Sequence, residues 1–173
     1  MDNTALFLLS YGVYAVTTKD VKDTGSGFAG CIANSAMQVT SSPARIAVAI
    51  NVDNYTNGCI KACRRFALNV IAEGTPPIII GTFGFRSGRN TDKLESISYA
   101  EIDGLPVLAE AAGCVICDVV ETHELGTHTI FIGEITNALR QGDKTPMTYE
   151  YYHRVIKGKS PKNAPTYVAP EST

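Results

Sequence analysis

Short runs of apolar and β-branched residues recur along the chain between turn signals, and this pattern predicts a mainly β domain. Six such runs occupy residues 12–18, 27–33, 45–51, 66–71, 113–121 and 127–139. Their spacing is typical of a barrel or sandwich. The segments 45–50 and 115–120 are too apolar for strands with one solvated face, so we expect both of their faces to be covered. A dimer interface is one source of that cover.

Two short helices are predicted from capping signals. Asn54 or Thr56 can cap the first helix, and Thr75 precedes Pro76 as an N-cap followed by proline at the first helical position. From residue 157 onward the chain is basic and rich in proline, which indicates an extended segment. We therefore expect one domain over residues 1–156 and a Lys/Pro-rich C-terminal tail over residues 157–173.

Length and composition indicate one soluble globular domain, with 173 residues, 45% hydrophobic and 18% charged. The net charge of -2 gives no general attraction for nucleic acid or anionic lipid, so neither is an expected partner. No basic stretch precedes the apolar residues 5–9, so no targeting peptide is expected. Five cysteines, an odd number, fit a reducing compartment, and the predicted location is the cytoplasm.

Residues 25–30 match the Gly-x-Gly-x-x-Gly dinucleotide fingerprint, which requires a strand before it and a helix after it. Here a polar turn comes before the motif, and the strand-like residues 31–33 come after it. A hairpin turn is therefore the preferred interpretation.

The cysteine pairs do not predict a metal site. Cys114 and Cys117 lie three residues apart on a predicted strand, where their side chains point to opposite faces, so we interpret both as packing residues. Cys59 and Cys63 share a helix face but lack a second pair of ligands. We expect them to be core or surface thiols, and no metal is predicted.

Two polar segments are candidates for binding a ligand. The run 34–43 places amides and hydroxyls between apolar strands, where they could match the donors and acceptors along the edge of a flavin ring, although an ordinary loop has the same composition. The loop 83–90 carries two arginines and a serine between glycines, which suits a phosphate monoester or a solvated turn.

Hydrolytic chemistry is poorly supported because the chain has no nucleophile elbow. His128 lies inside a predicted strand, where a lone histidine is more often structural than catalytic.

Taken in order, these segments resemble the flavin reductase-like, FMN-binding split-barrel family, in the form of flavoredoxins and of the front part of high-molecular-weight rubredoxins. The resemblance covers almost the whole chain and rests on residues 5–18, 34–43, 51, 54–56, 84–89, 126–134 and 149–153. It implies a six-stranded antiparallel split β-barrel with a few short helices. It also implies a homodimer with FMN at or near the subunit interface.

The same resemblance implies the roles of individual residues. On the ring and ribityl side it implies Asn34, Ser35, Ala36, Met37, Gln38, Thr40 and Ser41; for phosphate and ribityl contacts it implies Asn54, Thr56, Arg86, Ser87 and Lys93. Asn51, Phe85 and His153 complete the cofactor-binding set. His128 is the candidate catalytic residue, but Thr127 precedes it where many relatives have aspartate, so its role near the ring or the nicotinamide stays open.

The predicted function is that of an oxidoreductase that transfers electrons from NAD(P)H through bound FMN to a free flavin, a metal centre or a small redox protein. One alternative is a non-catalytic FMN-binding electron carrier reduced by a protein partner, and a more distant one is an interaction domain that has lost its flavin. Residues 157–167 also resemble the segment before the rubredoxin domain of fused relatives. Since no cysteine follows Cys117, we expect no iron site in this chain, and a rubredoxin would be a separate partner.

Overall fold

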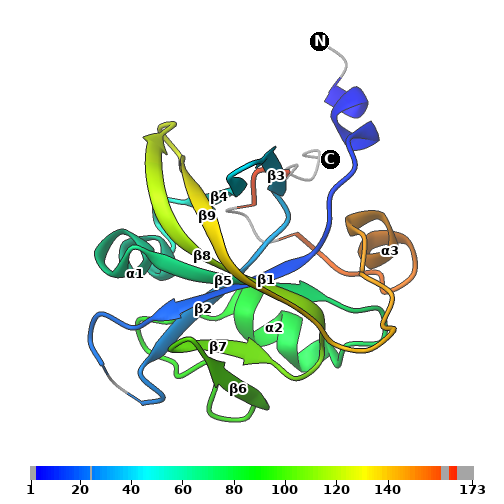
Figure 1. Cartoon of the computed structure of the whole chain (residues 1–173). Helices are drawn as coiled ribbons and strands as arrows, with labels where there is room; N and C mark the ends of the chain where they lie inside the picture. Colours follow the sequence, from blue (N-terminus) through cyan, green and yellow to red (C-terminus); the bar gives the residue numbers. More distant parts are fainter. Residues whose placement is uncertain (1–2, 24, 161–163, 167–173) are drawn as a thin grey trace.

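The fold is built from antiparallel strands. The computed structural model describes residues 3–23, 25–160 and 164–166 (Figure 1). The strands within these residues are β1 (Tyr14–Lys19), β2 (Phe28–Ala33), β3 (Ala36–Ser41), β4 (Ala44–Asn51), β5 (Arg65–Ile71), β6 (Tyr99–Ile102), β7 (Leu105–Leu108), β8 (Ala111–Glu124) and β9 (His128–Arg140). Seven of them form one sheet in the order β2-β1-β5-β8-β9-β4-β3, and β6 pairs with β7 in a separate hairpin.

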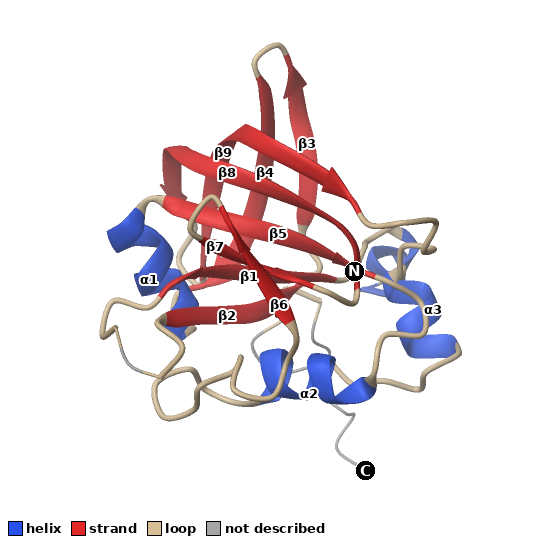
Figure 2. Ribbon diagram, turned by 60° about the horizontal axis from the view of Figure 1, so that its bottom comes forward, coloured by secondary structure: helices blue, strands red, loops and turns tan. Residues whose placement is uncertain are grey.

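Four short helices accompany the strands in the described part of the chain. They are the 3-10 helix η1 (Asn3–Leu8) and the α-helices α1 (Tyr55–Cys63), α2 (Pro77–Phe85) and α3 (Tyr149–Arg154). Figure 2 shows the sheet curling, with α1 at one side of it, α3 at the opposite side and α2 below it. None of these helices has the length and apolarity needed to cross a membrane.

All six predicted strand segments form strands, but the main sheet has seven strands where six were expected, and its hydrogen-bonded order has two open ends, β2 and β3. The additional strand is β3, which lies within the polar run. Its residues after Ala36 are exposed, so they carry no hydrophobic alternation by which a strand is recognised. Pairing of the β3 backbone with β4 makes it a strand.

The prediction that the 115–120 segment is covered on both faces is confirmed only for residues 115–117 of β8, because Asp118 and Val120 are exposed. Cys117 packs in the same core cluster as Phe66, whereas Cys114 and Ile116 pack in another cluster with Leu105 of β7. The second cover therefore comes from the β6–β7 hairpin of the same chain. Because Cys114 and Cys117 belong to different clusters on the two faces, their interpretation as packing residues is also confirmed.

The glycine motif forms a turn, as the preferred interpretation predicted. Gly25 and Gly27 have φ angles of 61° and 75°, and β1 pairs antiparallel with β2 across the turn. Gly30 lies within β2, where an added Cβ would lie 2.4 Å from the ring of Phe83. The absence of a side chain at Gly30 lets α2 pack directly on the strand, which brings the end of α2 close to the sheet.

Helix α1 begins as predicted, because the side chain of Asn54 accepts a hydrogen bond from the backbone N–H of Thr56. Helix α2 begins one residue later than predicted, at Pro77, and Thr75 is not its N-cap. Pro76 precedes a second proline, which disfavours helical geometry at Pro76, and its ψ of 132° is extended. Helix α3 was not predicted; Thr148 caps it by accepting a hydrogen bond from the Tyr151 N–H.

Candidate functional site

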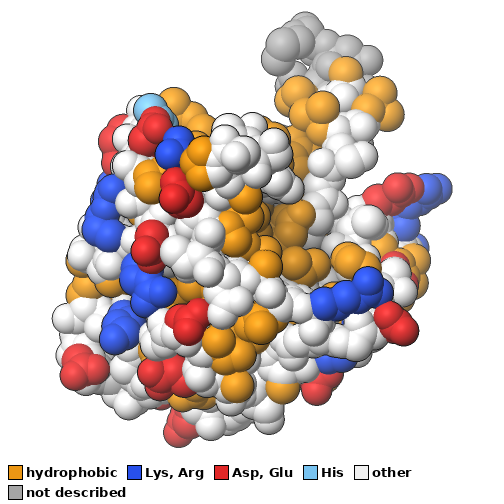
Figure 3. Space-filling model, in the orientation of Figure 1, with side chains coloured by type: hydrophobic (Ala, Val, Ile, Leu, Met, Phe, Trp, Pro, Cys, Tyr) orange, Lys and Arg blue, Asp and Glu red, His pale blue; other side chains and the backbone are white. Residues whose placement is uncertain are grey.

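One cavity of about 360 Å³ lies between the curled sheet and α2. Its walls come from the end of β2, the end of β4, the start of α1, the C-terminal half of α2, the start of β9, α3 and the C-terminal segment. Figure 3 shows hydrophobic side chains gathered in a hollow between the β3 side and the α3 side of the molecule. The lining thus combines an apolar interior with a few polar groups, as is typical of a small-molecule site.

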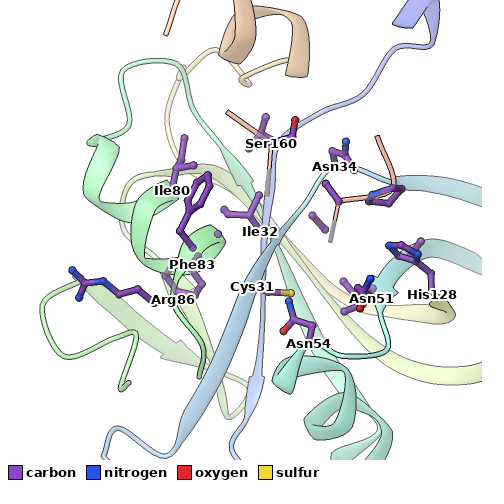
Figure 4. A pocket seen from close by; sticks show the side chains of 18 of the residues that line it. Cys31, Ile32, Asn34, Asn51, Asn54, Ile80, Phe83, Arg86, His128 and Ser160 are labelled. Atoms are coloured by element: carbon purple, nitrogen blue, oxygen red, sulfur yellow. The ribbon is translucent and has the colours of Figure 1, made fainter. Parts of the chain in front are cut away.

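The first polar wall is the turn between β4 and α1. The Asn51 side chain accepts a hydrogen bond from the Asp53 N–H at 2.9 Å, and the Asn54 side chain accepts one from the Thr56 N–H at 3.0 Å. Asn51 also pairs with His128 across β4 and β9, and Figure 4 shows these two side chains together on one side of the cavity. Local hydrogen bonds therefore fix the amides of this wall before any ligand binds.

A buried network holds α1 against β9. Asn57 is 2% exposed, and its Nδ2 donates to the Ile50 carbonyl at 3.1 Å and to Thr129 Oγ1 at 2.9 Å. Thr129 in turn donates to Glu124 at 2.9 Å, and Lys61 lies 2.7 Å from the same carboxylate. The hydrogen bond from Lys61, together with that from Thr129, lowers the pKa of Glu124. This network ties the start of α1 to the start of β9.

His128 is half-buried at the start of β9 and lines the cavity. Its Nδ1 lies 3.0 Å from the hydroxyl of Thr127. Its Nε2 is buried and has no hydrogen-bond partner within the described residues. An unpaired buried nitrogen is costly unless a ligand or water satisfies it, so Nε2 is the ring nitrogen available to a bound group.

The opposite wall comes from the end of α2. Phe83, Phe85, Arg86 and Ser87 line the cavity there, and Figure 4 shows Arg86 on the side away from His128. The exposed Arg86 side chain makes no hydrogen bond or ion pair within the described part of the chain. It is therefore free to pair with an anion at the rim.

Lys93 lies behind this wall rather than in it. The residue is 4% exposed, and its Nζ donates to the carbonyls of Gly30 at 2.7 Å and Phe83 at 3.0 Å. Burial lowers the pKa of Lys93. The Lys93 ammonium thus links β2 to α2 through these two hydrogen bonds, and Lys93 does not line the cavity.

Cys31 contributes a thiol to the floor of the cavity (Figure 4). Burial raises the pKa of Cys31 to about 11, so the thiol is protonated at neutral pH. It serves as an apolar wall rather than as a nucleophile. Within the described residues, no three side chains of His, Cys, Asp or Glu gather as metal ligands would.

The structure brings seven of the sequence-predicted site residues together in the cavity: Asn34, Asn51, Asn54, Phe85, Arg86, Ser87 and His128. The others lie outside its lining: Ser35, Ala36, Met37, Gln38, Thr40, Ser41, Thr56, Lys93 and His153. Most of these belong to β3, whose side chains from Met37 to Ser41 are exposed. Thr56 is buried beside the wall, with Oγ1 lacking a partner in the described part of the chain.

The sequence analysis placed His153 of α3 in the cofactor site but missed two tyrosines of the same helix and the residues of the C-terminal segment. Tyr149 and Tyr152, three residues apart on α3, line the cavity, as do Lys159, Ser160, Ala164 and Pro165. The spacing of the two tyrosines after the capping Thr148 is a helical signal that could have identified them. The proline-rich residues carry no local signal of this kind, because they are held by contacts with distant parts of the chain.

A family model described as "Flavin reductase like domain" matches residues 6–159. The high molecular weight rubredoxin of Moorella thermoacetica is 44% identical over 171 residues, covering 96% of this chain and 72% of the relative. The ferric-chelate reductase (NAD(P)H) of Archaeoglobus fulgidus is 37% identical over 169 residues, covering 96% of this chain and 98% of the relative.

Among solved structures, the NADH:FAD oxidoreductase of Streptomyces globisporus superimposes with a TM-score of 0.73 at 25% identity. The match covers 85% of this chain and 88% of that chain.

Proposed function

The chain belongs to the flavin reductase-like family, and from this premise we propose that it is an FMN-dependent oxidoreductase that takes electrons from NAD(P)H. The observation that supports a flavin site most directly is the cavity beside His128. Its volume of about 360 Å³ lies in the range of pockets that hold one small organic ligand. The buried Nε2 of His128, unpaired among the described residues, gives a planar heterocycle a polar anchor beside the apolar side chains of the cavity.

FMN is the flavin that we propose, although the Streptomyces globisporus relative is named as an NADH:FAD oxidoreductase. FMN ends in a phosphate monoester, and the exposed Arg86, with Ser87 beside it, supplies a cation and a hydroxyl at the rim. The amides of Asn34, Asn51 and Asn54 would then lie along the ring and ribityl portions. His128 would bind the ring region or the nicotinamide.

When bound, FMN supplies the redox chemistry: it accepts hydride from the nicotinamide and passes electrons to an acceptor. The chain's own contribution is to bind and orient. The apolar side chains of Ile32, Ile80 and Phe83 exclude water from the cavity. The network around Asn57 holds the start of α1 against β4 and the start of β9, which carries His128. Protonation of Cys31 removes a competing thiolate.

A homodimer is part of the proposal. Leu6 and Leu8 of η1 and the adjacent Leu9 are 57%, 84% and 57% exposed, and η1 extends from the body of the molecule (Figures 1 and 3). Met37 and Val39 are 67% and 42% exposed on β3, a strand at the open edge of the sheet. Exposed apolar groups beside an unpaired strand edge favour association with another copy. In the dimer, β3 would border the cofactor of the other subunit.

The electron acceptor that we propose is a free flavin, a metal chelate or a small redox protein. The names of two relatives, a ferric-chelate reductase and a rubredoxin, support the last two classes. A separate rubredoxin would be one such protein. We place the protein in the cytoplasm, because all five of its cysteines are free thiols and a reducing compartment preserves them.

An anaerobic titration tests this function. Protein loaded with FMN is mixed with NADH and, separately, with NADPH, and we expect the absorption of oxidised flavin to bleach with at least one of them. Loss of bleaching with both nucleotides, in protein that retains FMN, would contradict the reductase activity. If a reduced ferredoxin-like protein then bleaches the same sample, the chain is an electron carrier instead.

A further inference from the structure

The end of the chain returns to the cavity and touches one of its polar residues. Thr166 Oγ1 accepts a hydrogen bond from Asn34 Nδ2 at 2.9 Å and donates one to the hydroxyl of Tyr149 at 2.8 Å. Ser35 Oγ donates a hydrogen bond to Asn34 Oδ1 at 3.0 Å. Both the Nδ2 and the Oδ1 atom of the Asn34 side chain therefore have a hydrogen-bond partner. Asn34 itself is 5% exposed and lines the cavity.

The contact with Thr166 is one end of a longer chain of hydrogen bonds. The Tyr149 hydroxyl is bonded to Ser160 Oγ, and Ser160 Oγ lies 3.3 Å from His153 Nε2. The other ring nitrogen of His153, Nδ1, lies 2.9 Å from the carbonyl of Gly158. Figure 4 shows Ser160 and Asn34 at the same end of the cavity.

The chemistry of these groups sets the direction of every bond when His153 is neutral. A carbonyl only accepts, so Nδ1 of His153 carries the proton and Nε2 accepts. Ser160 must then donate to His153, Tyr149 to Ser160, and Thr166 to Tyr149. The hydroxyl of Thr166 is left to accept, and only the NH₂ group of Asn34 can donate to it. This series of hydrogen bonds therefore selects one of the two orientations of the Asn34 amide.

We propose that Thr166 is a positioning residue of the flavin site and that it acts by fixing the amide of Asn34. The inference rests on the proposed function, because it concerns the ring side of the same cavity. In this arrangement Ser160, Ala164 and Pro165 form a wall of the site. His153 contributes through its contact with Ser160 without lining the cavity.

The size and selectivity of the effect follow from the position of Asn34. A neutral hydrogen bond contributes about 1 kcal/mol, which corresponds to about a fivefold change in a dissociation constant. Asn34 is assigned to the ring side and Arg86 to the phosphate. Loss of the Thr166 hydroxyl should therefore weaken FMN and riboflavin equally, whereas a general loosening at the phosphate end would discriminate between them.

The test compares Thr166→Val with Thr166→Ser and with Thr136→Val. Valine keeps the shape of threonine without the hydroxyl, and serine restores the hydroxyl. Thr136 is an exposed residue of β9 that donates to the Ile116 carbonyl at 3.3 Å, so its variant also loses one hydroxyl hydrogen bond, outside the site. The dissociation constants of FMN and riboflavin are measured for each protein by quenching of flavin fluorescence.

We expect Thr166→Val to raise both dissociation constants about fivefold, Thr166→Ser to restore them, and Thr136→Val to leave them unchanged. Parent-like binding by Thr166→Val would overturn the inference, as would a failure of Thr166→Ser to restore binding. A parent protein that binds neither flavin would instead refute the proposed function. The outcomes for the two proposals are therefore distinct.

A second variant probes the far end of the hydrogen-bond chain. His153→Phe keeps an aromatic ring against Tyr149 and Tyr152 but removes the nitrogen that accepts from Ser160. We expect the same equal weakening of FMN and riboflavin, smaller than that of Thr166→Val, because Ser160 can still bond to Tyr149. Weaker binding of FMN with unchanged binding of riboflavin would contradict the proposed series of hydrogen bonds, since it would place His153 at the phosphate.

Discussion

Two polar regions that the sequence assigns to the cofactor differ in how their side chains are held. In the α1 corner, defined by Asn51, Asn54, Thr56 and Asn57, the amides bind backbone groups and neighbouring side chains at the edge of the core. On β3 the polar side chains are exposed, and Gln38 and Thr40 bond only to nearby carbonyls of their own hairpin. The corner is therefore a preformed wall of the cavity, whereas β3 is a surface open to another molecule.

The largest expected effect comes from replacing the buried amide of the corner. Asn57→Ala leaves the Ile50 carbonyl and the Thr129 hydroxyl without their donor, and we expect a loss of about 3 kcal/mol in the free energy of unfolding. Gln38→Ala on β3 removes an exposed amide and should cost less than about 0.5 kcal/mol. Urea denaturation measures both variants. Equal losses would show that the corner is no more rigid than β3.

Lys93 gives the next largest effect and distinguishes a structural cation from a phosphate ligand. Lys93→Met removes the donor of two buried carbonyls, and we expect a loss of about 2 kcal/mol in stability. Lys144 also donates to two carbonyls but is exposed, so Lys144→Met should cost much less. Lys93→Met should weaken FMN and riboflavin equally. Weaker binding of FMN with unchanged binding of riboflavin would instead support the role at the phosphate that the family resemblance implies for Lys93.

Replacing Arg86 should affect the binding of FMN but not stability, in contrast to replacing Lys93. Arg86→Ala leaves the fold unchanged because the side chain is exposed, but we expect FMN binding to weaken about tenfold or more while riboflavin binding stays unchanged. Arg89→Ala is the matched control, because Arg89 lies in the same loop but does not line the cavity. Isothermal titration calorimetry with both flavins measures the difference. Equal weakening of FMN and riboflavin binding by Arg86→Ala would show that Arg86 does not bind the phosphate.

The smallest change in the stability of the folded monomer is expected for a substitution on β3. Met37→Lys places a charge on an exposed apolar position, so the stability of the monomer should change by less than about 0.5 kcal/mol. Light scattering after size exclusion should nevertheless show less dimer than in the parent protein at the same concentration. Thr40→Lys, another exposed position of β3, serves as the charge-matched control. An unchanged dimer fraction in Met37→Lys would exclude this side chain from the interface.

Much of the fold was predictable because local chemistry determines it. The apolar runs of β5 and β8, the Asn54 cap and the positive φ angles of Gly25 and Gly27 are all signalled by adjacent residues. Strand β3 was not predictable from periodicity, since pairing with β4 rather than burial makes it a strand. The cover of β8 by the β6–β7 hairpin likewise depends on distant residues.

The site was predicted only in part, for the same reason. Arg86 was identified because a guanidinium suits a phosphate, and Asn54 and His128 because the family resemblance implies them. All three line the cavity. Lys93 has a suitable charge, but its ammonium is bound to the carbonyls of Gly30 and Phe83, which only the packing of α2 on β2 brings together. The role of Thr166 depends on a contact with Asn34 across 132 residues of sequence, and no local pattern indicates it.

The most direct test of the account is a crystal structure of the protein with FMN bound. We predict flavin density in the cavity, with the ring between the His128 side and Phe83 and with the phosphate against Arg86 and Ser87. Flavin density outside this cavity, or a phosphate bound away from Arg86, would contradict the assignment of the site.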